Sequence, residues 1–128
     1  MEEKTLTPEH VVRKVFDGQL NAHHKELVEK LWLQDVKYHE GDLTVVGRNK
    51  LESLIEERRG VLADLHYEID DIFSDGEKVA VRWHGKSPSL QSSGHNRKYW
   101  GISIMIVRDG KIVENWESVS QKPLENFA

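Results

Sequence analysis

The stretch that decides the fold is RKYWGISIMIVRDGKIVENWESVS, residues 97–120, in which two long apolar segments flank an Asp-Gly pair. An Asp-Gly pair between alternating apolar segments is the strongest short-range signal for a β-hairpin. The sequence therefore predicts two long antiparallel strands joined by a tight turn at Asp109-Gly110.

The second strand of this hairpin carries a carboxylate, Glu117, directly after a tryptophan. Because side chains alternate along a strand, we expect one face to hold Val113, Asn115, Glu117 and Val119, and the other Ile112, Glu114, Trp116 and Ser118. An ionised carboxylate is costly to bury without a partner. Glu117 is therefore a candidate for pocket chemistry, with a solvated strand end or an ion pair with Arg82 as the alternatives.

The first strand of the hairpin is apolar on both faces. Such a strand needs cover on both sides, and helices packed on the sheet can supply only one. We expect the other side to pair with a second copy of the chain as a homodimer, or to be covered by an extended helix. The side chains expected at the dimer interface are Trp100, Ile102, Ile104 and Trp116.

Upstream of residue 64, apolar residues at helical spacing predict three helices. The first begins at Pro8 and reaches Leu20, the second is capped by Asn21 and extends to Trp32, and the third runs over residues 47–62. Two short strands are expected at residues 35–39 and 43–46. The remainder alternates as sheet, with a bulge where the pattern slips at residues 71–73 and a loop at residues 87–96.

Helices followed by strands are typical of the α+β class, with the helices packed on one face of the sheet. The 128 residues fit one domain, residues 1–128. Neither a signal peptide nor a membrane-spanning segment is expected, and the absence of cysteine is consistent with a cytoplasmic protein. With a net charge of −4 and scattered basic residues, we expect no nucleic-acid partner. The seven histidines lack metal-ligand spacing, so no metal site is predicted.

Six segments in this order resemble the SnoaL-like polyketide cyclase family, within the superfamily of ketosteroid isomerase and nuclear transport factor 2. They are DVKYH (35–39), GR (47–48), ADLH (63–66), DGEKVAVRW (75–83), WGISI (100–104) and DGKIVENW (109–116). The resemblance implies a cone-shaped fold in which a curved antiparallel sheet wraps over three N-terminal helices. It also implies an apolar pocket for a small molecule and no cofactor.

The resemblance further implies three site positions. The acid/base Asp that cyclases carry on the last strand corresponds to Glu117, which keeps the carboxylate. Their pocket His on the preceding strand corresponds to Ser103, and the general base of ketosteroid isomerase corresponds to Glu40. The loop at residues 87–96 is shorter than in the family, so the resemblance does not indicate which substrate the pocket would take.

Further candidates surround these positions. His39 could donate to a substrate oxygen or orient Glu117, although a surface position on a turn is the alternative for both His39 and Glu40. The expected pocket lining, each member of which could instead be plain core, is Trp32, Tyr38, Tyr99, Ser103, Met105 and Asn115. Which of Arg82 and Trp83 faces inward is left open.

Two classes of function fit these observations. The first is a cofactor-free enzyme of the cyclase, isomerase or dehydratase type, in which Glu117 moves a proton on a small carbonyl compound. His39, Ser103 or Tyr99 would then stabilise the enolate oxygen. The second is a non-catalytic module of the same fold that binds a small apolar ligand or only dimerises.

Overall fold

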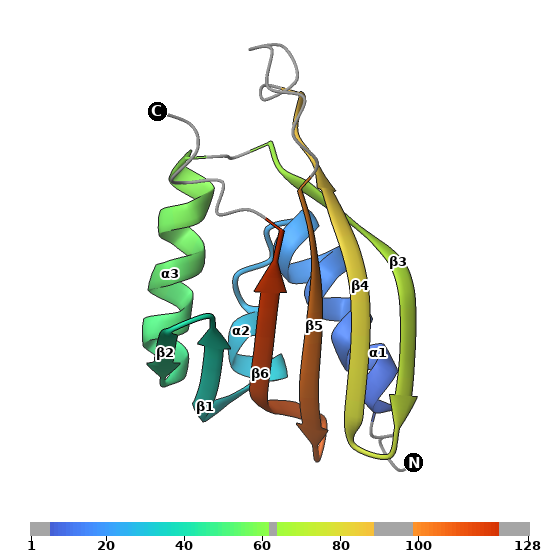
Figure 1. Cartoon of the computed structure of the whole chain (residues 1–128). Helices are drawn as coiled ribbons and strands as arrows, with labels where there is room; N and C mark the ends of the chain where they lie inside the picture. The colour runs from blue at the N-terminus through green and yellow to red at the C-terminus, as the bar shows by residue number, and fades with distance from the viewer. Residues whose placement is uncertain (1–5, 62–63, 89–98, 121–128) are drawn as a thin grey trace.

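The computed structural model of the chain describes residues 6–61, 64–88 and 99–120. A six-stranded sheet with the strand order β2-β1-β6-β5-β4-β3 forms one layer, and the helices form the other (Figure 1). The elements are α1 (Pro8–Lys14), the π-helical segment η1 (Val15–Asn21), α2 (Leu27–Leu31), β1 (Trp32–Glu40), β2 (Leu43–Val46), α3 (Arg48–Val61), β3 (His66–Asp75), β4 (Lys78–Lys86), β5 (Tyr99–Arg108) and β6 (Lys111–Val119).

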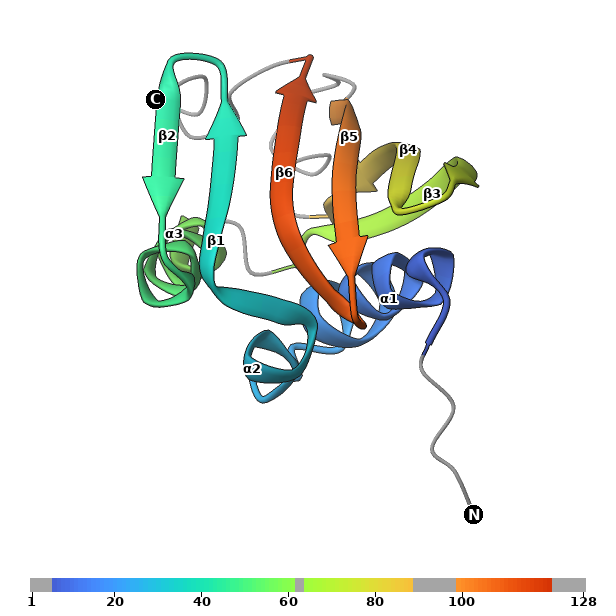
Figure 2. The ribbon, with the colours of Figure 1, turned by 90° about the horizontal axis from the view of Figure 1, so that it is seen from below.

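The sheet curves around the helices, which all lie on its concave side (Figure 2). Helix α1 and segment η1 pack against β3, β4 and β5, whereas α3 packs against β1 and β2. The core lies between these layers and includes Val11 and Val12 from α1 and Val15 and Phe16 from η1. The predicted α+β class, with a curved sheet over N-terminal helices, is confirmed.

The sheet is mixed rather than wholly antiparallel, because β1 and β6 run parallel to each other. Strand β1 forms a hairpin with β2 at one edge, and the β3-β4-β5-β6 meander returns the chain beside β1. The register of this parallel pair places Tyr38 opposite Asn115 and Glu40 opposite Glu117. Two carboxylates that are far apart in the sequence therefore become neighbours.

The predicted hairpin is present, with its turn at Asp109-Gly110. Both turn residues have positive φ angles, 52° and 79°, which is the geometry of the primed turns that connect two strands directly. On the inner face, Ser103 pairs with Glu117 and Met105 pairs with Asn115. The hairpin therefore fixes which side chains reach the interior.

One detail of the predicted alternation is wrong. The register between β5 and β6 shifts after Ile106, so that Val107 pairs with Ile112 and Ile106 pairs with Glu114. This bulge turns Ile112 into the core on the same side as Asn115, and Ile112 is fully buried. The slip that the sequence did predict, at residues 71–73, corresponds to the register shift between Ile69 and Asp71 in β3.

The second predicted helix differs most from the structure. Helix α2 ends at Leu31, and Trp32 already belongs to β1, which is longer than the predicted strand at residues 35–39. Asn21 does not cap this helix. Its side chain donates to the carbonyl oxygen of Tyr67 at 2.8 Å and accepts from the Tyr67 amide at 2.7 Å. Asn21 thus fastens η1 to β3 at the level of Tyr67.

The first predicted helix, from Pro8 to Leu20, is α-helical only as far as Lys14 and continues as the π-helical segment η1. The remaining predicted elements agree with the structure over the described residues. Strand β2 covers residues 43–46, and in β4 the residues Val79, Val81 and Trp83 are buried. Most of the predicted loop at residues 87–96, and Leu62 of the predicted third helix, lie outside the described residues. Within the described part of the chain, no helix is long and apolar enough to cross a membrane.

Candidate active site

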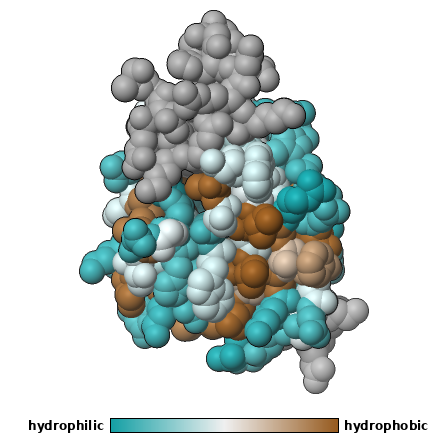
Figure 3. All heavy atoms as spheres, in the orientation of Figure 1, coloured by the Kyte–Doolittle hydropathy of each residue, from teal (hydrophilic) through white to brown (hydrophobic). Residues whose placement is uncertain are grey.

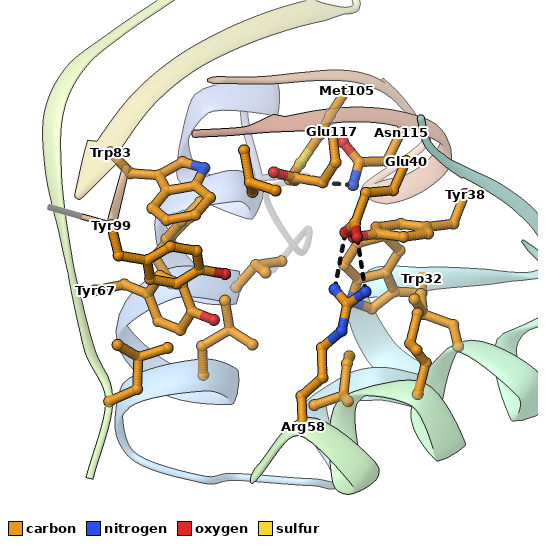
Figure 4. Close-up of a pocket in the computed structure, with 18 of the residues that line it drawn as sticks. Trp32, Tyr38, Glu40, Arg58, Tyr67, Trp83, Tyr99, Met105, Asn115 and Glu117 are labelled. Atoms are coloured by element: carbon orange, nitrogen blue, oxygen red, sulfur yellow. Dashed lines mark hydrogen bonds and ion pairs between the residues drawn. The ribbon is translucent and has the colours of Figure 1, made fainter. Parts of the chain in front are cut away.

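A cavity of about 110 Å³ lies between the concave face of the sheet and the helices (Figure 4). It is similar in size to the ~150 Å³ engineered cavity that binds benzene, so it suits a small organic molecule. Its lining is mainly apolar and aromatic, with a few polar side chains from β1, α3 and β6. The described lining residues are Val15, Phe16, Leu20, His23, Trp32, Tyr38, Glu40, Leu51, Leu54, Ile55, Arg58, Leu65, Tyr67, Trp83, Tyr99, Met105, Asn115, Glu117 and Val119.

Glu117 lines the cavity from β6, and its two oxygens have different surroundings. Oε1 accepts a hydrogen bond from the Ser103 hydroxyl at 2.5 Å and another from the Asn115 amide at 3.2 Å. Oε2 is buried and accepts no hydrogen bond from any side chain in the described ranges. Glu117 as a whole keeps part of its surface exposed, but its Oε2 atom is buried.

The pKa of Glu117 is raised to about 7. Burial is the main cause, because removing the carboxylate from water disfavours its charged form. Hydrogen bonds from Ser103 and Asn115 act in the opposite direction, and the negative charge of Glu40 raises the pKa further. The result is a carboxyl group that can both release and accept a proton near neutral pH.

The direction of the hydrogen bonds distinguishes the two oxygens of Glu117. An indole N–H can only donate, so the Ser103 hydroxyl must accept from Trp83 Nε1, at 3.0 Å. Its single hydrogen then goes to Glu117 Oε1. Gly101 makes room for this arrangement, because a methyl group there would collide with the Trp83 ring. Oε2 is left as the oxygen of Glu117 without a hydrogen-bond donor among the described side chains.

A second polar cluster joins β1 to α3 within the cavity lining (Figure 4). Arg58 donates from Nη1 to Glu40 Oε1 at 2.8 Å and from Nη2 to Glu40 Oε2 at 2.7 Å. The Tyr38 hydroxyl also donates to Glu40 Oε1, at 2.6 Å. Burial is the largest single effect and would lower the pKa of Arg58, but the hydrogen bonds to Glu40 and the nearby charges of Glu40 and the ionised forms of Tyr38 and Tyr99 together raise it.

An aromatic wall faces this cluster across the cavity (Figure 4). Tyr67 and Tyr99 each meet the Trp83 ring edge-on, with ring centroids 5.2 Å apart in both pairs. Burial is the main cause that raises the pKa of Tyr67 to about 12, and it also raises the pKa of Tyr99. Both phenols therefore remain neutral hydrogen-bond donors at physiological pH, and they lie within hydrogen-bonding reach of each other.

The structure brings most of the residues singled out in the sequence to this cavity. The lining contains Glu117 and Glu40, together with the predicted pocket residues Trp32, Tyr38, Tyr99, Met105 and Asn115. Ser103 is fully buried behind the lining, where it holds Glu117. Glu40 is not an exposed turn residue but is 8% exposed and paired with Arg58.

His39 is the predicted site residue that the structure places elsewhere. Because Tyr38 and Glu40 point inward from β1, the residue between them points to the outer face. There the His39 ring stacks on Trp116 with centroids 5.4 Å apart, and its Nε2 lies 2.7 Å from Glu114 Oε2. The expectation that His39 orients Glu117 or contacts a ligand in this cavity is therefore wrong.

The open question about Arg82 and Trp83 is also answered. Trp83 is 3% exposed and faces the cavity, whereas Arg82 is exposed and pairs with Asp71. An ion pair between Arg82 and Glu117 is excluded. Glu117 instead has Ser103 and Asn115 as its described hydrogen-bond donors.

Sequence reasoning missed Arg58 and Tyr67. A signal for Arg58 was present, because it continues the apolar stripe of α3 at helical spacing after Leu51, Leu54 and Ile55. A charged residue on a buried stripe is unusual and indicates a partner or a function. Tyr67 alternates with Leu65 and Ile69, but the sequence gives no sign that its hydroxyl reaches the site.

A comparison with protein families gives a match over most of the chain. A family model described as the SnoaL-like domain matches residues 12–115. The chain belongs to the SnoaL-like family. None of the curated proteins compared with this chain matches it.

Solved structures similar to this SnoaL-like chain share its fold at low sequence identity. IdmH, a candidate polyketide cyclase from Streptomyces antibioticus, has a TM-score of 0.77 at 18% identity, covering 90% of this chain and 93% of its own. A candidate ketosteroid isomerase from Kribbella flavida has a TM-score of 0.73 at 20% identity, covering 90% and 78%. An LEH-like epoxide hydrolase from M. tuberculosis has a TM-score of 0.69 at 18% identity, covering 88% and 82%. Identities this low show a shared fold and do not transfer an activity.

No group of three or more His, Cys, Asp or Glu side chains that could hold a metal ion occurs in the part of this SnoaL-like chain that the structure describes.

The raised pKa of Glu117 predicts a pH-dependent stability. Since the folded pKa of about 7 exceeds the unfolded value of 4.5, the folded state binds the extra proton and stability falls as pH rises between these values. Replacing Glu117 with Gln removes this dependence. The free energy of unfolding of the variant minus that of the wild type should therefore be about 2–3 kcal/mol higher at pH 8 than at pH 5.

Urea unfolding of both proteins at the two pH values measures this difference. Every other titrating group is present in both proteins, so the comparison isolates Glu117 together with its electrostatic coupling to neighbours such as Glu40. A difference between the two proteins that stays constant with pH would contradict the raised pKa.

Proposed function

We propose that this protein is a cofactor-free acid/base enzyme of the cyclase, isomerase or dehydratase type, acting on a small apolar carbonyl compound. The observation that carries the proposal is Glu117, a carboxyl group in an apolar cavity whose pKa is about 7 and whose Oε2 has no partner among the described side chains. General bases work best when their pKa lies near the operating pH. The shared fold with proteins named as cyclases and isomerases supports the same class.

In this proposal, Glu117 Oε2 accepts a proton from the carbon next to the substrate carbonyl. The electron pair left on that carbon moves to the carbonyl oxygen and gives an enolate. The protonated Glu117 then returns the proton to a carbon atom, or to the oxygen that leaves in a dehydration. No electrons are gained or lost overall, so the chemistry needs no redox partner.

The enolate oxygen needs hydrogen-bond donors, and the tyrosine pair supplies them. The hydroxyls of Tyr67 and Tyr99 point into the cavity from the wall that faces Glu40 and Arg58 (Figure 4). If one phenol donates to the other, the second still has its hydrogen available for a substrate oxygen. Removing a donor of this kind typically costs about 3–4 kcal/mol of transition-state stabilisation.

The other predicted site residues take different roles in this proposal. The only hydrogen of the Ser103 hydroxyl is engaged with Glu117, so Ser103 positions the base and does not contact the enolate. Both oxygens of Glu40 accept hydrogen bonds from Arg58, so we assign the base role to Glu117 alone. Asn115 keeps Glu117 in place, and its Oδ1 is buried without a hydrogen-bond partner among the described residues, available to a ligand.

Hydrogen–deuterium exchange tests this role without knowledge of the natural substrate. The wild type should catalyse exchange of the α-protons of small cyclic ketones in D₂O, measured by proton NMR. The Glu117→Gln variant should lose about 100-fold or more of this rate, because general-base catalysis typically contributes 10²–10⁴-fold. The matched control is Glu114→Gln, the same change on the outer side of the same strand, which should leave the rate unchanged.

Exchange that persists in the Glu117→Gln variant would exclude the acid/base role. The protein would then be better described by the alternative function, a non-catalytic module of the same fold that binds a small ligand.

We also propose that the protein forms a homodimer through the outer face of the sheet. Trp100, Ile102, Ile104 and Trp116 are between 40% and 46% exposed there, and apolar side chains gather over the middle of this face (Figure 3). Ile104 and Trp116 are direct partners across β5 and β6, so the patch is continuous. A sheet face can pair with its own copy about a twofold axis, which would cover the patch.

The dimer has its own test. An Ile102→Asp change would bury an unpaired charge at the interface and should shift the solution mass to that of a monomer, measured by light scattering. Phe73→Asp is the matched control, because Phe73 is 67% exposed on β3 and outside the patch. A wild-type protein that is already monomeric would contradict this proposal.

A further inference from the structure

Arg58 carries the one guanidinium group among the described residues that line the cavity. A guanidinium presents parallel N–H groups that match the two oxygens of a carboxylate. In this protein that pairing is already made, because both terminal nitrogens of Arg58 donate to the two oxygens of Glu40. Glu40 therefore takes the position that the carboxylate of a ligand would need.

Burying the ion pair between Glu40 and Arg58 costs free energy. Glu40 is 8% exposed and the Arg58 side chain is 34% exposed, so both charges have lost much of their water. A buried ion pair often contributes no more stability than apolar side chains of the same size. Its presence in the lining of a cavity therefore points to an effect on what the cavity accepts.

The charges around the cavity favour the same conclusion. Among its described lining residues, Glu40 and Glu117 are carboxylates and Arg58 is their one guanidinium counterpart. Once Glu40 and Arg58 compensate each other, ionised Glu117 leaves this group with an excess negative charge. An anionic ligand would have to break the bidentate pair and also lie close to the carboxylate of Glu117.

We propose that Glu40 is a specificity-determining residue that occupies the anion-binding groups of Arg58 from within the protein, so that the cavity accepts uncharged compounds and rejects carboxylates. This inference rests on the proposed function only in that the cavity binds a small molecule. It narrows the substrate class to neutral carbonyl compounds. It also assigns a latent anion site to the cavity, which becomes available when Glu40 loses its charge.

The test compares two probes of nearly the same shape, benzyl alcohol and benzoate, at pH 8.5, where Glu117, with its pKa of about 7, is ionised. Binding is followed through the indole N–H signals of the four tryptophans by NMR. Trp32 and Trp83 line the cavity and report binding there, whereas Trp100 and Trp116 lie on the outer face and serve as internal controls. The wild type should bind benzyl alcohol at least about tenfold more tightly than benzoate, because the anion meets a filled pair and a second carboxylate.

The Glu40→Gln variant keeps the side-chain shape and can still accept from Tyr38, but it releases Arg58. Its affinity for benzoate should rise about tenfold or more, since a charge-assisted bidentate pair becomes available, while its affinity for benzyl alcohol changes little. The double variant Glu40→Gln/Arg58→Gln has no charge at this site and should lose the gain. Circular dichroism confirms that each variant is folded, and the wild-type comparison does not depend on any variant.

The outcomes separate this inference from the proposed function. If the wild type binds benzoate as tightly as benzyl alcohol, or if Glu40→Gln binds benzyl alcohol but gains no benzoate affinity, Glu40 does not control specificity. If the cavity tryptophans of the wild type respond to neither probe, the cavity is not a small-molecule site and both proposals fail.

Discussion

The burial of one carboxyl group under the sheet is the constraint on which the rest of the site depends. Glu117 occupies an inward-facing position of β6, where its charged form is disfavoured and its pKa is raised to about 7. Ser103 and Asn115 donate to one oxygen only, and Oε2 keeps no partner among the described side chains. Donors around both oxygens would stabilise the carboxylate, and an apolar shell would keep the acid protonated. Because donors surround only one of its oxygens, Glu117 can exist as a carboxylate or as a carboxylic acid near neutral pH.

The position of this carboxyl has consequences across the fold. The parallel pairing of β1 with β6 places Glu40 opposite Glu117, and the charge of Glu40 raises the pKa of Glu117. Two neighbouring carboxylates need a compensating charge, which α3 supplies through Arg58. The other side of the cavity is built on Trp83, whose indole holds Ser103 and whose ring supports Tyr67 and Tyr99. The curved sheet, helix α3 and the aromatic wall thus all border the same cavity.

Local sequence patterns correctly predicted the features that neighbouring residues determine, such as strand alternation and turn position. Alternation along β5 and β6 placed Glu117, Asn115 and Met105 on the inner face, and Asp109-Gly110 fixed their register. Long-range pairing was not predictable in this way. Nothing near Glu40 indicates that Arg58, 18 residues later, will neutralise it, and the adjacent Gly41-Asp42 favoured an exposed turn. His39 was misplaced because the strand continues through Glu40, and Ile112 was misplaced because a bulge interrupts the alternation.

The most direct test of this account is the pKa of Glu117 itself. Carbon-detected NMR can follow the side-chain carboxyl signal of the wild type through a pH titration, and the Glu117→Gln variant assigns the signal by its loss. The account predicts a midpoint of about 7, well above the usual value of 4.5. A midpoint at or below 4.5 would mean that the carboxylate is solvated or ion-paired, and it would contradict the assignment of Glu117 as an acid/base group.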